Sequence, residues 1–73
     1  MSPRVDLLMR RTELVKRIRK IAKAKNATAT FDEGSSHTIV RFNGRKVTLV
    51  GRHNEIPEWT ARGALRDAER WEP

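Results

Sequence analysis

His37 and His53 are the two histidines of the chain, and histidine is the side chain that most readily exchanges protons near neutral pH. His37 follows Gly34-Ser35-Ser36, a small polar segment whose backbone amides and hydroxyl groups could hold a phosphate. His53 lies three residues past a strand predicted at residues 45–50, so both imidazoles could lie at one end of a sheet. We expect His37 to act as a general acid/base, and we favour a backbone or phosphate contact for His53 over a second catalytic role.

A lone histidine is more often an ordinary surface residue than a catalytic one, but three features weigh against that interpretation of His37. It is predicted outside the core, it follows the polar turn, and no acidic residue stands between positions 34 and 54 to neutralise Arg41, Arg45 and Lys46. RNA carries its own nucleophile, the 2′-hydroxyl, so its cleavage needs a base, an acid and positive charge near the phosphate, without a metal. The pattern therefore predicts RNA cleavage, with the three cations assisting the phosphate.

Size and charge favour a polymer as the ligand. The chain has 73 residues, enough for one domain. Such a domain buries roughly 60% of its unfolded surface and encloses no deep cavity. Lys and Arg number 16 against 9 Asp and Glu, which gives a formal net charge of +7. This excess favours binding of a polyanion, and an acidic protein partner is the next interpretation.

Composition also excludes several classes of site. The chain has no cysteine, so disulfides, thiolate metal sites and a cysteine nucleophile are excluded. Two histidines alone do not favour a zinc site, and we expect neither a metal nor a small-molecule cofactor. No apolar run approaches the length of a membrane span, so we expect no membrane contact and a cytoplasmic location.

The first element is predicted as a helix within residues 4–25, because apolar side chains recur there at helical spacing. The apolar stripe consists of Leu7, Leu14, Val15, Ile18, Ile21 and Ala22, and the basic side of Lys16, Arg17, Arg19, Lys20 and Lys23. The helix could start at Ser2, as cap before Pro3, or at Thr12, which we favour. Asn26 is the expected stop. Residues 1–11 would then be an extension of uncertain order, and residues 12–73 a single domain.

Three strands are predicted next. Residues 27–32 alternate between apolar and polar side chains, and a turn follows at residues 32–36. Strands at 37–42 and 45–50 are joined by Asn43-Gly44, the strongest short hairpin signal. A regular hairpin would pair His37 with Val50. Its core face would carry Thr38, Val40, Phe42, Val47 and Leu49, and its open face His37, Ile39, Arg41, Lys46, Thr48 and Val50.

A second helix is predicted to start at Pro57, with Glu58 in its first turn, after a loop at residues 51–56. Its apolar stripe is formed by Ala61, Ala64, Leu65 and Ala68, with Trp71 closing it. The order of elements predicts an α+β domain, in which a three-stranded antiparallel sheet carries both helices on one face.

These segments together resemble the HicA family, toxins of bacterial toxin–antitoxin pairs. The resemblance extends from about Thr12 to Asp67. Its more specific parts are Gly34-Ser35-Ser36-His37 and Thr60-Ala61-Arg62 with Leu65-Arg66-Asp67. The remaining matches are Glu13-Leu14-Val15-Lys16, Asn43-Gly44-Arg45-Lys46-Val47-Thr48-Leu49-Val50 and Arg52-His53-Asn54-Glu55-Ile56.

The resemblance implies a fold like that of double-stranded RNA-binding domains, with the order α-β-β-β-α. It also implies metal-independent cleavage of mRNA by a single histidine, which falls on His37, and silencing by a HicB-type antitoxin. Two departures stand in this chain: a second serine precedes the histidine, and Gly51 replaces a proline found in many members. The residues that we expect to bind RNA are Ser35, Ser36, Arg41, Arg45, Lys46, Arg52 and His53. The alternatives are an RNA-binding module that does not cut and a purely protein-binding role.

Overall fold

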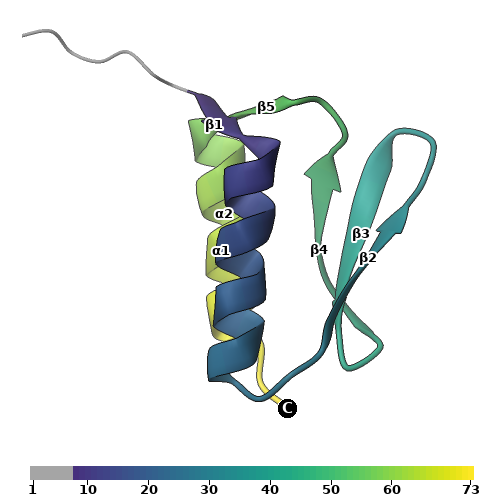
Figure 1. Ribbon diagram of the computed structural model, residues 1–73, viewed down its shortest axis with the longest axis vertical. Coiled ribbons are helices and arrows are strands. Elements are labelled where there is room, and N and C mark those ends of the chain that lie inside the picture. Colours follow the sequence, from purple (N-terminus) through teal and green to yellow (C-terminus); the bar gives the residue numbers. More distant parts are fainter. Residues whose placement is uncertain (1–7) are drawn as a thin grey trace, which may run out of the picture.

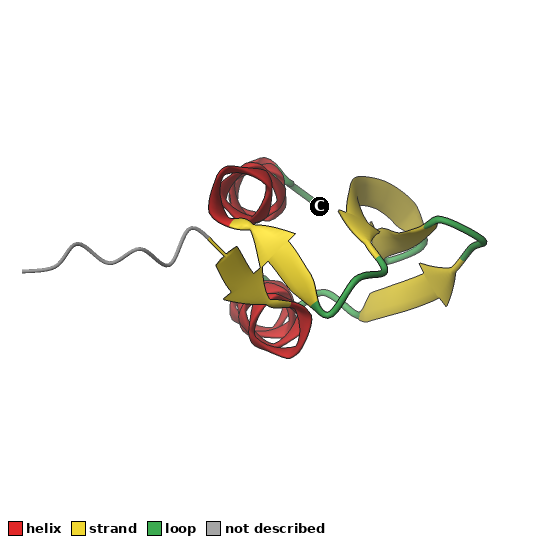
Figure 2. Cartoon of the chain, turned by 90° about the horizontal axis from the view of Figure 1, so that it is seen from above, coloured by secondary structure: helices red, strands yellow, loops and turns green. Residues whose placement is uncertain are grey.

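The computed structural model describes residues 8–73 and has an α+β fold. Its elements are β1 (Leu8–Arg10), α1 (Arg11–Ala24), β2 (Ala29–Glu33), β3 (His37–Phe42), β4 (Arg45–Gly51), β5 (Glu55–Pro57) and α2 (Glu58–Arg70). Strands β2, β3 and β4 form the predicted three-stranded antiparallel sheet. The two helices lie side by side on one face of this sheet, so its other face is open (Figures 1 and 2).

Helix α1 starts two residues earlier than a cap at Thr12 would place it, and it has no side-chain cap. Its N-cap is Arg10, which makes no capping hydrogen bond, so the prediction of Thr12 as the cap is wrong. The alternative start at Ser2 lies outside the described residues. At the other end Asn26 adopts a φ of 58°, and the amide of Ala27 donates to the carbonyl oxygen of Ala22 at 2.8 Å. This left-handed residue after the helix is the predicted stop.

A two-stranded sheet was not expected from the sequence. Strand β1 pairs antiparallel with β5, with Leu8 opposite Pro57 and Met9 opposite Ile56. Ile56 is buried and Met9 packs against the core. Residues 8–10 are therefore an ordered strand rather than part of an extension, and the predicted loop 51–56 contains the start of β5. Each of these two strands places only one apolar side chain against the core. A single apolar residue does not make an alternating pattern, so neither strand could be recognised in the sequence.

The β3–β4 hairpin has the predicted turn but a different register. Asn43 and Gly44 both adopt positive φ, 55° and 83°, as a two-residue hairpin turn requires. A bulge next to Val40 then leaves Val47 without its own partner, so Val40 pairs with Thr48 rather than Val47. Because a bulge places two residues opposite one, every later pair shifts by one residue.

The shift reverses the predicted faces of β4 beyond the bulge. Thr48 and Val50 are buried, with exposed fractions of 8% and 1%, whereas Leu49 is 42% exposed. The core side of β3 is as predicted, with Thr38, Val40 and Phe42 all fully buried. The outer face of β4 therefore carries Leu49, whereas a regular hairpin would have placed Thr48 and Val50 there.

The core lies between the sheet and the two helices. Its buried apolar residues are Leu14, Ile18, Ala22, Val40, Phe42, Val50, Ile56, Ala61, Ala64, Ala68 and Trp71. Phe42 meets Trp71 edge to face, with ring centroids 5.4 Å apart. Lys25 donates from Nζ to the carbonyl oxygens of Glu69 and Trp71. It thereby supplies a hydrogen-bond donor to carbonyl groups at the C-terminal end of α2. Within residues 8–73, neither helix is long and apolar enough to cross a membrane.

Candidate active site

His37 is the first residue of β3 and lies on the open face of the sheet. The following residue, Thr38, points into the core, so the alternation of a strand directs His37 outward, where it is exposed. Its partner on β4 is Gly51 rather than the predicted Val50. Strand β2 ends at Glu33, which pairs with Thr38. Since Gly51 has no side chain and β2 stops one position short, the imidazole is accessible from solvent on the open face.

The β2–β3 turn immediately before His37 is closed by a backbone hydrogen bond. The amide of Gly34 donates to the carbonyl oxygen of His37 at 2.8 Å. A Cβ atom at position 34 would lie 3.0 Å from this same oxygen, so glycine fits the close approach. Ser35 and Ser36 form the exposed tip of the turn. The two consecutive serines are thus part of a closed turn.

Four of the predicted RNA-binding residues come together beside this turn. Ser35, Ser36, Arg52 and His53 line one shallow depression that is open to solvent. The two serines belong to the β2–β3 turn, and the other two side chains follow β4. Their hydroxyl, guanidinium and imidazole groups are hydrogen-bond donors that suit an anionic ligand. Within residues 8–73, no cluster of three His, Asp or Glu side chains is placed to hold a metal ion.

The other three predicted RNA-binding residues lie at the opposite end of the hairpin. Arg41 pairs with Lys46, and Arg45 pairs with Phe42 next to the turn. Arg41 lies four positions after His37 on β3, which corresponds to roughly 13 Å at a rise of about 3.3 Å per residue. Arg41, Arg45 and Lys46 therefore do not converge with His37 on a single phosphate.

The expectation that no carboxylate pairs with these cations is wrong for Arg41. Asp32 on β2 accepts a hydrogen bond from Nε of Arg41 at 2.9 Å. The Arg45 guanidinium lies 5.7 Å from the centroid of the Trp71 ring. Acidic residues that precede the turn in sequence come next to the basic residues of β3 because the strands run antiparallel.

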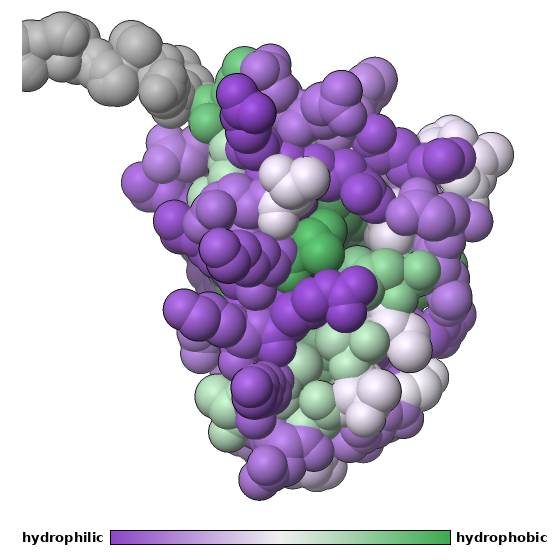
Figure 3. All heavy atoms as spheres, viewed as in Figure 1, coloured by the Kyte–Doolittle hydropathy of each residue, from purple (hydrophilic) through white to green (hydrophobic). Residues whose placement is uncertain are grey.

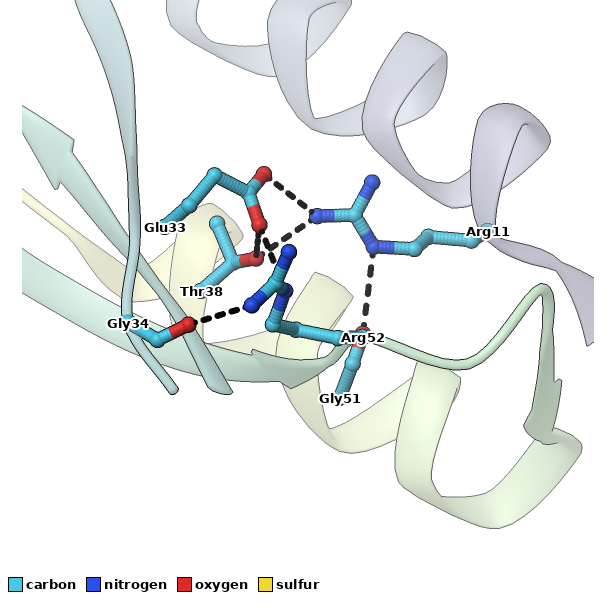
Figure 4. A network of polar contacts seen from close by, with 6 residues as sticks. All are labelled: Arg11, Glu33, Gly34, Thr38, Gly51 and Arg52. Carbon is cyan, nitrogen blue, oxygen red and sulfur yellow. Dashed lines mark hydrogen bonds and ion pairs between the residues drawn. The ribbon is translucent and has the colours of Figure 1, made fainter. Parts of the chain in front are cut away.

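Glu33 is the centre of a polar network at the His37 end of the sheet (Figure 4). The Thr38 hydroxyl donates to Oε1 of Glu33 at 2.9 Å, and Nη2 of Arg11 donates to Oε2 at 2.9 Å. Nε of Arg52 lies 3.0 Å from Oε1. One carboxylate thus joins β2 to β3, to α1 and to the segment after β4.

The two arginines of this network also hold the backbone on both sides of His37. Arg52 donates from Nη1 to the carbonyl oxygen of Gly34 at 2.6 Å. Arg11 donates from Nε to the carbonyl oxygen of Gly51 at 3.1 Å, and from Nη2 to the Thr38 hydroxyl at 2.6 Å. Arg11 and Glu33 were not candidates from the sequence, because contacts 22 positions apart leave no periodic pattern.

The surroundings of Glu33 keep it ionised. The hydrogen bond from Thr38 is the largest cause that lowers the pKa of Glu33 below its ordinary value of 4.5, and the Arg11 and Arg52 guanidinium groups lower it further, while desolvation opposes the shift. At neutral pH the carboxylate is therefore charged and accepts all of these contacts.

The basic side of α1 is a separate surface. Lys16, Lys20 and Lys23 are exposed on the side opposite the buried stripe. Two other cations of this helix have partners: Arg17 pairs with Glu13 at 2.9 Å, and Arg19 lies 4.7 Å from the centroid of the Phe31 ring. Figure 3 shows hydrophilic side chains covering the helix, with apolar groups visible in the hollow beside the sheet.

Comparison with known proteins adds no relative: no protein-family model, no curated protein and no solved structure matches this chain.

Proposed function

We propose that this protein is a metal-independent endoribonuclease of the HicA type, an mRNA interferase toxin in which His37 is the general acid/base. The observation that carries this proposal is that His37 is exposed and directly follows Ser35 and Ser36, which line a depression together with Arg52 and His53. An imidazole with adjacent anion-binding groups is the equipment that cleavage through the 2′-hydroxyl needs.

In the proposed reaction His37 accepts the proton of the ribose 2′-hydroxyl. The 2′-oxygen then bonds to phosphorus, and the bond from phosphorus to the 5′-oxygen of the next nucleotide breaks. The products are a 2′,3′-cyclic phosphate and a 5′-hydroxyl end, with the proton on the leaving oxygen delivered by an imidazolium or by water. The serine hydroxyl groups and Arg52 would stabilise the charge on the phosphate oxygens.

Arg52 can stabilise a phosphate while it keeps its contacts with Glu33 and Gly34. Its Nε and Nη1 groups contact Glu33 and Gly34. A guanidinium carries five N–H donors in a rigid fork, so further donors remain for a phosphate. Contact with Glu33 would reduce its effective positive charge without preventing a directed hydrogen bond.

A second candidate function is an RNA-binding module that does not cut. It is favoured by the distance between His37 and the three cations at the hairpin turn, because Arg41, Arg45 and Lys46 cannot stabilise a phosphorane formed at the imidazole. These residues could still contact phosphates further along a bound strand. Arg41 and Lys46 lie with His37 on the open face of the sheet, whereas Arg45 pairs with the buried Phe42 and lies over Trp71 on the helix side.

The proposal includes a protein partner and a cellular location. A HicB-like antitoxin is the expected partner, and the net charge of +7 suits an acidic protein or the RNA itself. A toxin that cleaves mRNA would act in the cytoplasm. No small-molecule cofactor enters the proposed reaction.

Cleavage of an in vitro transcribed messenger RNA by wild-type protein, His37→Ala and His53→Ala tests the proposal. With EDTA present, the wild type should cut the RNA and leave 2′,3′-cyclic phosphate ends, and His37→Ala should lose cleavage by about 100-fold or more. His53→Ala, which removes the other imidazole from the lining of the depression, should weaken RNA binding but leave kcat near the wild-type value. A DNA of the same sequence should remain intact.

The outcomes separate the candidates. Cleavage that persists in His37→Ala would show that the catalytic assignment is wrong. If the wild type binds the RNA but leaves it intact, the module without catalysis is correct. Binding to 2′-O-methyl RNA of the same sequence measures affinity without cleavage, so it shows whether His37→Ala has kept the interface.

A further inference from the structure

The backbone on both sides of His37 is attached to the start of α1 through one side chain. Arg11 contacts Thr38, the next residue of β3, and the carbonyl oxygen of Gly51, the partner of His37 on β4. It also contacts Glu33, where β2 ends. A single guanidinium therefore holds the ends of all three strands of the sheet (Figure 4).

Apolar packing contributes little to the position of the β2–β3 turn and of the segment that follows β4. Residues 34–37 and 52–54, which flank the network, are all exposed. The placement of the turn relative to the helix therefore depends on hydrogen bonds and ion pairs. Thr38 is fully buried, so the Arg11 contact to its hydroxyl is shielded from water and is stronger than an exposed contact would be.

Arg11 differs from Arg52 in its access to a ligand. The Arg11 side chain is 22% exposed, against 49% for Arg52. Arg52 also lines the depression with the serines, and Arg11 does not. An RNA phosphate in this depression would reach Arg52, whereas Arg11 is occupied by three protein acceptors behind it.

We propose that Arg11 is a positioning residue for His37: its guanidinium fixes the strand ends around His37 relative to α1 and so sets the direction of the imidazole toward the RNA. This inference rests on the proposed endonuclease function. The planar guanidinium makes three contacts at fixed angles, and a lysine ammonium cannot reproduce this geometry. A displacement of about 1 Å in a reacting group can cost up to about 100-fold in rate.

Kinetics of Arg11→Lys and Arg11→Gln on an in vitro transcribed messenger RNA test this role. We expect kcat to fall by about tenfold to 100-fold in both variants, with KM near the wild-type value. Arg17→Gln is the matched control, since it removes an arginine of the same helix whose ion-pair partner is Glu13. It should leave both constants unchanged. The measured activity is divided by the fraction of folded protein, which circular dichroism gives.

A second measurement keeps the test independent of catalysis. The Cε1–H NMR signal of the His37 imidazole, recorded at fixed pH, reports on its surroundings. It should shift or broaden in Arg11→Gln and stay in place in Arg17→Gln. If the wild type cuts no RNA, the proposed function fails but this signal still reports on positioning.

Two results would overturn the inference. One is an unchanged His37 signal in Arg11→Gln. The other is a loss of activity that the loss of folded protein accounts for completely, with kcat per folded molecule at the wild-type value. Arg11 would in that case serve stability alone.

Discussion

Nε of Arg11 donates a hydrogen bond of 3.1 Å to the carbonyl oxygen of Gly51, and Gly51 is the cross-strand partner of His37. This contact joins the first residue of α1 to the last residue of β4. The same guanidinium reaches Thr38 on β3, so the histidine lies between two fixed points of the backbone. His37 is thus exposed, but the backbone around it is held by partly buried hydrogen bonds.

Val50→Ala should destabilise the protein more than Leu49→Ala. In a regular hairpin, Leu49 would face the core and the order of the two effects would be reversed. Val50 is 1% exposed and Leu49 is 42% exposed. Val50→Ala removes two buried methyl groups and should lower the free energy of unfolding by roughly 2 kcal/mol. Leu49→Ala should cost less than about 1 kcal/mol, although it removes more atoms. Urea unfolding followed by circular dichroism measures both values.

The reverse order of the two effects would mean that β4 has the register of a regular hairpin. A third variant, Val47→Ala, checks the bulge itself, because Val47 is only partly buried. Its cost should lie between those of the other two.

The hairpin illustrates what local pattern can and cannot predict. The Asn43-Gly44 turn follows from two adjacent residues that tolerate positive φ, and the first pair, Phe42 with Arg45, follows from the turn. The bulge depends instead on which of Val47, Thr48 and Leu49 packs best under the helices. That choice is made by tertiary contacts and leaves no signal in the alternation.

Lowering the pH should weaken the network around Glu33. The pKa of Glu33 is lowered in the folded protein, chiefly by the Thr38 hydroxyl and then by Arg11. Its contribution to stability is therefore present above the unfolded-state pKa and is lost as the pH falls through the folded-state pKa. Glu33→Gln should destabilise the protein at pH 7, and its difference from wild type should shrink well below pH 4.5, the ordinary value for glutamate.

Glu13→Gln is the comparison for this measurement. The Arg17 hydrogen bond lowers the pKa of Glu13 too, but the pair lies within one exposed helix face. Exposed pairs of this kind contribute little, so Glu13→Gln should destabilise less at pH 7. An equal effect of both substitutions in urea unfolding would show that the Glu33 network adds nothing beyond a surface ion pair.

The candidate site was predicted in part. The depression groups Ser35, Ser36, Arg52 and His53, four residues that the sequence singled out for RNA binding without predicting that they lie together. The sequence-based prediction placed the cations near the hairpin turn too close to His37. They share its hairpin, but they lie at the opposite end of the extended strands. Arg11 could not be assigned, since its role arises from strand ends that only the folded chain brings together.

Glycine replacements at two sites should change stability in opposite directions. Gly44 has a φ of +83°, and a Cβ there would meet no atom within 4 Å. Gly44→Ala should therefore destabilise by about 1 kcal/mol through backbone strain alone. Gly63 in α2 also has free space around its Cβ position, and Gly63→Ala should stabilise by roughly 0.5–1 kcal/mol through helix propensity. Thermal unfolding measures both, and a stabilising Gly44→Ala would contradict the left-handed turn.

The salt dependence of RNA binding should reveal whether Arg52 contacts a phosphate. The affinity of the His37→Ala protein, which under the proposed function does not cut RNA, is measured for a single-stranded RNA between low and moderate salt. Each phosphate contact adds about 0.7 to the magnitude of the slope of log affinity against log salt. Adding Arg52→Gln should reduce the slope by roughly this amount, whereas Arg62→Gln, an exposed arginine of α2 paired with Glu58, should leave it unchanged. Equal slopes in all three proteins would place the RNA away from the depression beside His37.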